Sequence, residues 1–221
     1  MFESFLRRKL PVVTLAWLIL ALVLRPVGAI QAETVPPTTD EPLTSVPMWF
    51  TPMPAIFASG PQFEALGAAG RFTFDNTGYT FANADPDSGA FVTVRMQFEL
   101  GRAQSLLVAD RLTGVVNDLR GTSPAAWRRN LPTYGRLVYQ GLYPGIDLMY
   151  EGRPGRLKGL FTVAAGANPA NIQWRYAGAE KVEVTQPNGE LWIKLPRDGH
   201  YLVSGAPIAW QEYGQRKVPV S

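Results

Sequence analysis

The chain contains no cysteine and one histidine, His200, among its 221 residues. The missing cysteines exclude a disulfide framework, a cysteine zinc site and a thiol nucleophile. One histidine excludes zinc proteases with a His-Glu-x-x-His motif. A Ser-His-Asp triad stays formally open, but Gly-x-Ser-x-Gly is absent and His200 directly follows the Asp-Gly pair of an expected turn. We therefore interpret His200 as structural. The sequence also contains neither a P-loop nor a dinucleotide-binding fingerprint.

Charge is also scarce, since charged residues make up only 18% of the chain and the formal net charge is +3. The excess is confined to residues 1–32, which carry four basic residues and one acidic residue, so the remainder is neutral. A basic excess at one terminus does not indicate a nucleic-acid-binding surface. We expect no nucleic-acid partner.

Residues 1–32 are typical of a secretory signal peptide. A basic RRK motif precedes an apolar stretch at residues 10–24, and small residues predict cleavage after Ala29 or Ala32. Arg25 ends the stretch short of the roughly 20 residues that a spanning helix needs, and an uncleaved membrane anchor is the alternative. We expect an exported protein, extracellular or on the cell surface, that contacts the membrane only through this signal helix.

Residues 33–61 hold seven of the 19 prolines with little periodicity, which predicts a Pro-rich linker. An apolar patch in it, MWFTPMPAIF, is unusual for a free linker and suggests docking on the domain. The domain itself is predicted at residues 62–221. Apolar residues make up 46% of the chain, which is enough for a sizeable core.

Short strands separated by turn residues dominate the predicted domain. RFTFDNTGYTF (71–81) predicts a hairpin with Gly78 in a left-handed conformation. FVTVRMQFEL (91–100) alternates, and its predicted buried face consists of Val92, Val94, Met96 and Phe98. Further hairpins are expected around PNG, PRDG and YGQ. The fold class is therefore all-β, an antiparallel β-sandwich or flattened barrel.

SPAAWRRN (123–130) is the one stretch that favours a helix. Pro124 suits the first helical position, and Pro132 limits the helix to one or two turns. The basic pair Arg128–Arg129 and the segment RPGRLK (153–158) are expected to be solvated loop charges.

YPGIDLMY (143–150) predicts a tight turn followed by a strand. Pro144 sets φ at the second turn position, and Gly145 supplies the positive φ that a type II turn needs at the third. We interpret Asp147 as part of this architecture, accepting hydrogen bonds from turn amides or pairing with an arginine. A calcium ligand or an acid/base group is the alternative, although no second carboxylate has calcium-loop spacing. NADPDSG (83–89) is the nearest approach, and it is more simply a polar hairpin loop.

Five aromatic residues lie within 24 positions: Trp127, Tyr134, Tyr139, Tyr143 and Tyr150. Such a cluster either packs a β core or forms a platform on which sugars stack. We favour core packing.

The run from Trp127 to Gly152, followed by LKGLFTVAAGANPANIQWRYAGA and GAPIAWQEYGQRKVPV, resembles the N-terminal domain that precedes SBBP-type β-propeller repeats in large exported bacterial proteins. The resemblance covers roughly residues 91–221. The residues at family spacing are Trp127, Pro132, Tyr134, Tyr139, Tyr143, Pro144, Gly145, Ile146, Asp147 and Tyr150. The resemblance implies an exported, mostly β domain of unassigned activity.

Three features depart from that family. PQFEALGAAGRF (61–72) only loosely matches its usual Glu-Asn-x-Gly-Gln opening, and Asp118 stands where an aromatic residue normally follows Asn117. No propeller repeats follow residue 221, and the sequence ends in an apolar-alternating strand without a turn. We therefore expect a domain truncated at its C-terminal end.

The sequence predicts a non-catalytic structural or interaction module of an exported multidomain protein, without cofactor or metal. The expected partners are a downstream β-propeller or other extracellular domains, and protein or glycan ligands. The alternative is a carbohydrate-binding module, or a carbohydrate-active enzyme that uses surface aromatics and carboxylates such as Asp147 and Glu151.

Overall fold

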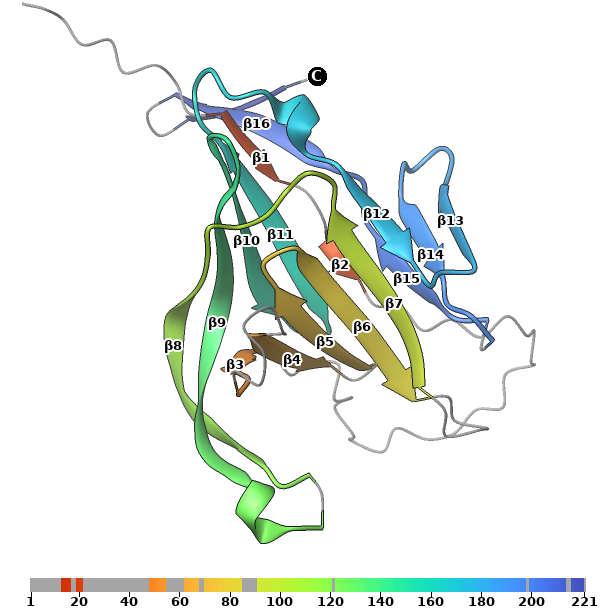
Figure 1. Cartoon of the computed structure of the whole chain (residues 1–221). Helices are drawn as coiled ribbons and strands as arrows, with labels where there is room; N and C mark the ends of the chain where they lie inside the picture. The colour runs from red at the N-terminus through yellow and green to blue at the C-terminus, as the bar shows by residue number, and fades with distance from the viewer. Residues whose placement is uncertain are drawn as a thin grey trace, which may run out of the picture.

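The computed structural model describes residues 13–16, 19–21, 48–54, 62–67, 70–84, 91–120, 122–197, 199–213 and 216–220. Most of these residues lie in antiparallel β-strands, which confirms the all-β prediction. The strands belong to a curled sheet whose two walls face each other across one core (Figure 1).

The first wall is a meander that begins in the predicted linker, and β12 is added to it from later in the chain. Its strands in spatial order are β3 (Phe50–Pro52), β4 (Phe63–Gly67), β5 (Gly70–Asp75), β6 (Gly78–Ala84), β7 (Phe91–Phe98) and β12 (Trp174–Ala177). Each neighbouring pair is antiparallel. The turn at residues 76–77 connects β5 to β6 directly, which is possible because the two strands are adjacent and antiparallel.

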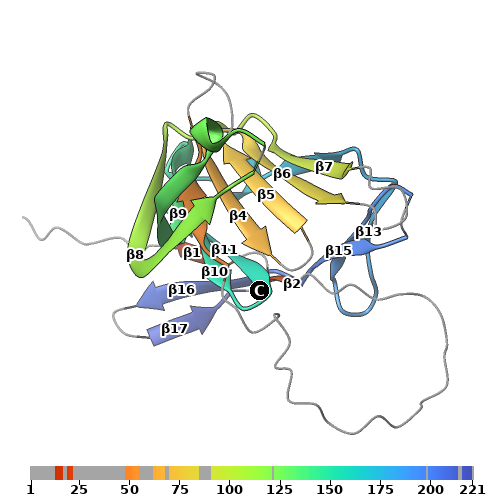
Figure 2. The same cartoon turned by 90° about the horizontal axis from the view of Figure 1, so that it is seen from below.

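The second wall consists of β8 (Ser105–Asp118), β9 (Arg128–Tyr143), β10 (Ile146–Arg153) and β11 (Arg156–Val163). The long strand β9 joins the two walls, because its Tyr134 pairs with Phe50 of β3. The β8–β9 hairpin extends past the rest of the sheet, and a short helical turn lies at its tip (Figures 1 and 2). The hairpin lies beside β3 at Tyr134 of β9, and the end of β8 lies near β3 and β4.

The core follows the predicted alternation. Val92, Val94, Met96 and Phe98 of β7 are all buried. The opposite wall contributes Tyr139, whose ring meets that of Phe98 edge to face at 5.4 Å. Full burial of such side chains stabilises the fold by roughly 1.5–3 kcal/mol each.

The apolar patch of the predicted linker belongs to this core. Met48 is 4% exposed and Phe50 is fully buried, with its ring edge to face against Phe74 at 5.5 Å. Residues 48–54 therefore pack on the domain, as the composition of the patch suggested.

Two glycines are required by backbone geometry. Gly145 has φ of +71°, the positive value that the sequence predicts for the turn between β9 and β10. Gly78, the first residue of β6, has a positive φ of +152°, a value that side chains rarely adopt, so the expectation of a glycine conformation in this hairpin is confirmed. A Cβ at Gly78 would lie 2.1 Å from the carbonyl oxygen of Met96, which shows that close approach of β7 is the second reason for glycine.

Two single 3-10 turns are the helical elements among the described residues. Pro124–Ala126 matches the predicted turn, and Pro169–Asn171 was not predicted. The second turn is capped by Asn168, whose side chain accepts a hydrogen bond from the N–H of Ala170 at 3.0 Å. In the described part of the chain, no helix has the length and apolar character needed to cross a membrane.

The remaining strands extend the sheet beyond β11, with which only β1 and β2 among them pair directly. They are β1 (Val13–Ala16), β2 (Ile19–Ala21), β13 (Lys181–Val184), β14 (Leu191–Lys194), β15 (Tyr201–Ser204), β16 (Ile208–Tyr213) and β17 (Arg216–Pro219). β13–β14, β14–β15 and β16–β17 are the predicted C-terminal hairpins. β1 and β2 pair with β11, so the described pieces of the apolar N-terminal stretch are strands, not the expected signal helix. The rest of residues 1–32 lies outside the described residues.

Candidate functional site

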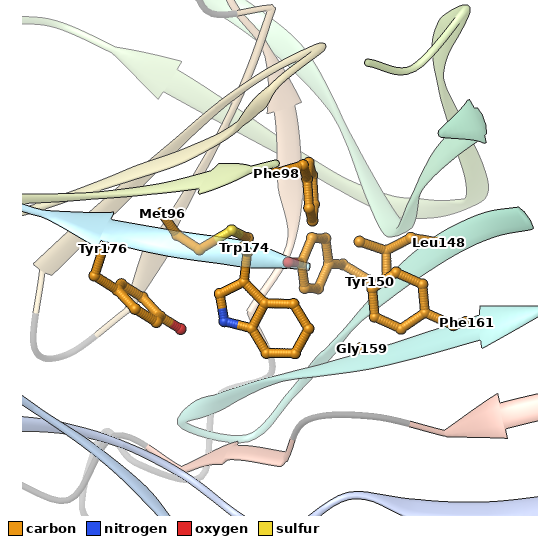
Figure 3. Close-up of a pocket in the computed structure, with 8 residues that line it drawn as sticks. All are labelled: Met96, Phe98, Leu148, Tyr150, Gly159, Phe161, Trp174 and Tyr176. Atoms are coloured by element: carbon orange, nitrogen blue, oxygen red, sulfur yellow. The ribbon is translucent and has the colours of Figure 1, made fainter. Parts of the chain in front are cut away.

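The first candidate region is an aromatic cleft where β11 and β12 meet through side chains (Figure 3). It is lined by Met96, Phe98, Leu148, Tyr150, Gly159, Phe161, Trp174 and Tyr176. The rings of Phe161 and Trp174 lie nearly parallel, with centroids 6.4 Å apart and an interplanar angle of 12°. β12 belongs to the first wall and β11 to the second, so the cleft marks the seam of the curled sheet.

The size of the aromatic cleft excludes a sugar-sized ligand. Its free volume is about 10 Å³. That is near the minimum for a single water molecule, whereas small-molecule sites are at least roughly 300 Å³. The aromatic cleft is therefore a packing seam.

Two tyrosine hydroxyls are buried near this seam. Burial raises the pKa of Tyr79 well above its usual value, and it raises the pKa of Tyr176 to about 12. The two hydroxyls interact with each other, but neither makes a hydrogen bond of normal geometry within the described residues. Both phenols stay protonated at neutral pH, and they offer no anionic nucleophile or base there.

The second candidate region, which we call the arginine pocket, has a volume of about 300 Å³. It lies where the β8 end of the long hairpin crosses β3, β4 and β5. Its lining residues are Trp49, Thr51, Glu64, Leu66, Arg71, Val116, Asn117, Asp118, Leu119 and Arg120. The volume reaches the lower end of the range for small-molecule sites.

Glu64 of β4 is the most deeply buried charged group that lines the arginine pocket. Its side chain is only 4% exposed, which is rare for a carboxylate unless it is paired. Arg120 Nη2 donates to Oε1 at 3.0 Å and to Oε2 at 3.2 Å, and Arg128 Nη2 donates to Oε1 at 3.2 Å. The Nε of Arg71 lies 3.7 Å from Oε2, which makes an ion pair without a hydrogen bond.

Asp118, at the end of β8, shares the same two arginines. Arg120 donates to it through Nε at 2.5 Å and Nη2 at 2.6 Å, and Arg128 donates through Nη2 at 2.7 Å. The hydrogen bonds from Arg120, followed by those from Arg128, hold the pKa of Asp118 well below its usual range. The same contacts with Asp118 raise the pKa of Arg120 above its already high value.

This ion cluster fastens the projecting hairpin to the first wall. Arg128 also donates through Nη1 to the carbonyl oxygen of Pro52 in β3 at 2.9 Å. The expectation that Arg128 is a solvated loop charge is therefore wrong, because it lies at the start of β9 with its side chain 22% exposed. Its neighbour Arg129 is exposed and stacks over Trp127 at 5.7 Å.

Asp147 lies in β10, directly after the YPGI turn. Its Oδ1 accepts a hydrogen bond from the N–H of Gly141 at 2.6 Å. Gly141 belongs to β9 and has φ of +60°, at an irregularity in the pairing of β9 with β10. The amide that Asp147 holds is thus in the neighbouring strand, outside the turn at residues 143–146.

The other predicted carboxylate and the histidine do not join a common site. Glu151 pairs with Arg153 at 2.9 Å, and the backbone carbonyl of His200 accepts from the N–H of Leu195 at 2.8 Å in the β14–β15 connection. Across the described ranges, no group of three or more His, Cys, Asp or Glu side chains is arranged to hold a metal ion. Most of NADPDSG lies outside the described residues.

The five clustered aromatics divide into a core group and a peripheral group. Tyr139, Tyr143 and Tyr150 are buried, and Tyr139 and Tyr143 donate hydrogen bonds to the carbonyls of Gly78 and Gln173. Trp127 and Tyr134 are half-buried. Three of the five are therefore unavailable as a stacking surface.

Sequence reasoning did not identify the arginine pocket. Glu64 and Arg71 come from β4 and β5, far along the chain from Asp118 and Arg120 at the end of β8. The available indication was Asp118 itself, a carboxylate at a position where the resembled family has an aromatic residue.

The curled antiparallel sheet, with one packed seam and one charged pocket, defines an all-β domain without an assembled catalytic constellation in its described part. A protein-family profile described as a domain of unknown function (DUF7948) matches residues 57–221. The chain belongs to this family. No curated protein and no solved structure matches the chain.

Proposed function

We propose that this chain is a non-catalytic structural or interaction module of an exported bacterial multidomain protein. The observation that carries the proposal is that its candidate acid/base groups are already engaged. Glu64 and Asp118 accept hydrogen bonds from two arginines, and Asp147 holds a backbone amide. A general base needs a lone pair within hydrogen-bond reach of the proton that it abstracts, and the arginines occupy those of Glu64 and Asp118. These carboxylates instead brace strands.

Export and multidomain context rest on the sequence. The signal-like residues 1–32 support export, and the resemblance to the domain that precedes SBBP-type repeats supports a downstream β-propeller or other extracellular domain as partner. Mass spectrometry of the N-terminus from fractionated cells tests the first point. A chain beginning after Ala29 or Ala32 is expected, whereas an intact Met1 in the membrane fraction would favour an anchor.

A carbohydrate-binding role is the second candidate. The aromatic cluster offers little support for it, because Tyr139, Tyr143 and Tyr150 are buried. The arginine pocket favours it more, because it is large enough for a small ligand and includes Trp49.

A glycan array together with a turnover assay separates these functions. The leading proposal predicts no hydrolysis of any glycoside, and capture of neighbouring domains of the parent protein in a pull-down. Turnover that Asp147→Asn abolishes would replace it with an enzymatic role. Tight glycan binding without turnover would favour the second candidate.

A further inference from the structure

The arginine pocket has a charge imbalance. Three guanidinium groups, Arg71, Arg120 and Arg128, surround two carboxylates, Glu64 and Asp118. The cluster therefore carries one uncompensated positive charge. Such a charge beside a pocket attracts an anion, most strongly where the walls exclude water.

The free charge belongs to Arg71. Arg120 and Arg128 each contact both carboxylates, and all hydrogen bonds from their guanidinium groups to Glu64 and Asp118 are within 3.2 Å. The guanidinium of Arg71 has only the 3.7 Å ion pair with Glu64 and makes no hydrogen bond to any described residue. Its side chain is 37% exposed. Its guanidinium donors are thus available to a ligand in the pocket.

The other residues that line the pocket could contact a ligand ring that has apolar faces and one polar edge. Trp49 is half-buried and provides an indole, while Leu66 and Leu119 are apolar side chains exposed by 43% and 49%. Asn117 accepts from the N–H of Asn130 at 2.9 Å through Oδ1, which leaves its amide NH₂ for a ligand oxygen. Indole faces stack against the apolar faces of rings.

We infer that the arginine pocket binds a sugar acid, with its carboxylate on Arg71 and its ring against Trp49. A guanidinium fork matches the two oxygens of a carboxylate. A monoanion fits the single excess charge, whereas the second charge of a phosphate would face Glu64 and Asp118 across the pocket. The inference deepens the second candidate, a carbohydrate-binding role, by naming its ligand class, and it rests on the non-catalytic proposal only in requiring binding without turnover.

The test uses the exported, processed chain and two sugars that differ at one carbon. Glucuronate and glucose are titrated separately, and binding is followed by NMR through the indole N–H signals of the tryptophans. Glucuronate is expected to bind saturably and to shift the signal that Trp49→Phe removes. Glucose is expected to bind at least about tenfold more weakly, because one hydrogen bond to a charged group corresponds to about that factor.

Arginine variants identify the anchor. Arg71→Gln should weaken glucuronate binding by about tenfold or more, and Arg71→Lys should weaken it less, since lysine keeps the charge and loses the fork. Arg102→Gln, at an exposed arginine that does not line the pocket, should leave binding unchanged. The melting temperature of each variant confirms its fold, and Arg71→Lys carries the test if Arg71→Gln does not fold.

Three outcomes would overturn the inference. These are equal binding of glucose and glucuronate, no effect of either Arg71 variant, or an equal loss with Arg102→Gln, which would indicate non-specific attraction. A failure here leaves the proposed function standing, because domain capture and the absence of turnover are measured separately. Turnover of a glucuronide would instead defeat the proposed function.

Discussion

The backbone N–H of Gly141 donates a 2.6 Å hydrogen bond to Oδ1 of Asp147 and so ties β9 to β10 at the point where their register shifts. Gly141 needs a positive φ of +60° at this irregularity, and its amide is satisfied by a side chain of the next strand. This hydrogen bond to the backbone accounts for an aspartate at position 147. Its exposed position requires no ligand.

We expect Asp147→Asn to lower the free energy of unfolding by about 1 kcal/mol, because a charge-assisted hydrogen bond becomes a neutral one. Asp147→Ala should cost more, since the Gly141 amide then loses its partner. Chemical denaturation of the three proteins measures this order. Added calcium should leave the melting temperature of the wild type unchanged, because a ligand specific to the folded state would raise it. A calcium-dependent rise that Asp147→Asn removes would reveal a metal site.

Gly145→Val should be severely destabilising. The backbone φ of +71° is strained for a β-branched residue, at a cost of roughly 1–3 kcal/mol, and a Cβ would lie 2.8 Å from the Cβ of Ala167. Gly166→Val is the matched control, because Gly166 has φ of +85° and no atom within 4 Å of its built Cβ. The loss of stability at Gly145 should therefore exceed that at Gly166. Equal losses would mean that the Ala167 contact yields without cost.

The ion cluster should make the domain sensitive to acid. The pKa of Asp118 is lowered in the folded state, so the stability it contributes is present above its unfolded pKa of about 4 and is lost as the pH falls below that value. Melting temperatures measured from pH 7 down to pH 3 should decline. Asp118→Asn should lower the stability at pH 7 and flatten the decline. An identical pH profile in wild type and variant would remove Asp118 from this account.

Two buried tyrosines allow a paired test of hydrogen-bond satisfaction. Tyr139 donates to the carbonyl of Gly78 at 2.8 Å, so Tyr139→Phe should cost about 1–2 kcal/mol. The buried Tyr79 hydroxyl interacts with that of Tyr176 but makes no hydrogen bond of normal geometry among the described residues, so Tyr79→Phe should cost less than Tyr139→Phe. Unfolding of the wild type and both variants in denaturant measures the two changes in the free energy of unfolding. A larger loss for Tyr79→Phe would show that its hydroxyl has a partner.

Much of the fold was predictable because strand and turn preferences are local. The alternation in FVTVRMQFEL identified the buried face of β7, since successive side chains of a strand point to opposite sides. The Pro-Gly pair of YPGID predicted a positive φ at Gly145, which the structure contains. Neither inference required knowledge of any distant residue.

Other features were set by surroundings that the local pattern does not contain. The apolar stretch at residues 10–24 favoured a helix, yet its described pieces add to the edge of β11 as strands. At Gly78 the sequence predicted the positive φ, but the close approach of Met96 in β7, a second requirement for glycine, comes from a distant strand. In both cases the deciding neighbour comes from another strand.

By itself the sequence determined the all-β class, the hairpins and the main buried faces, because periodicity and turn chemistry act over a few residues. Only the tertiary structure decided where the charges meet. Glu64 pairs with Arg120 and Arg128, which lie 56 and 64 positions further along the chain. That meeting depends on the curl of the sheet and on the register of β8 with β9, and a shift of one residue would turn these side chains to the opposite face.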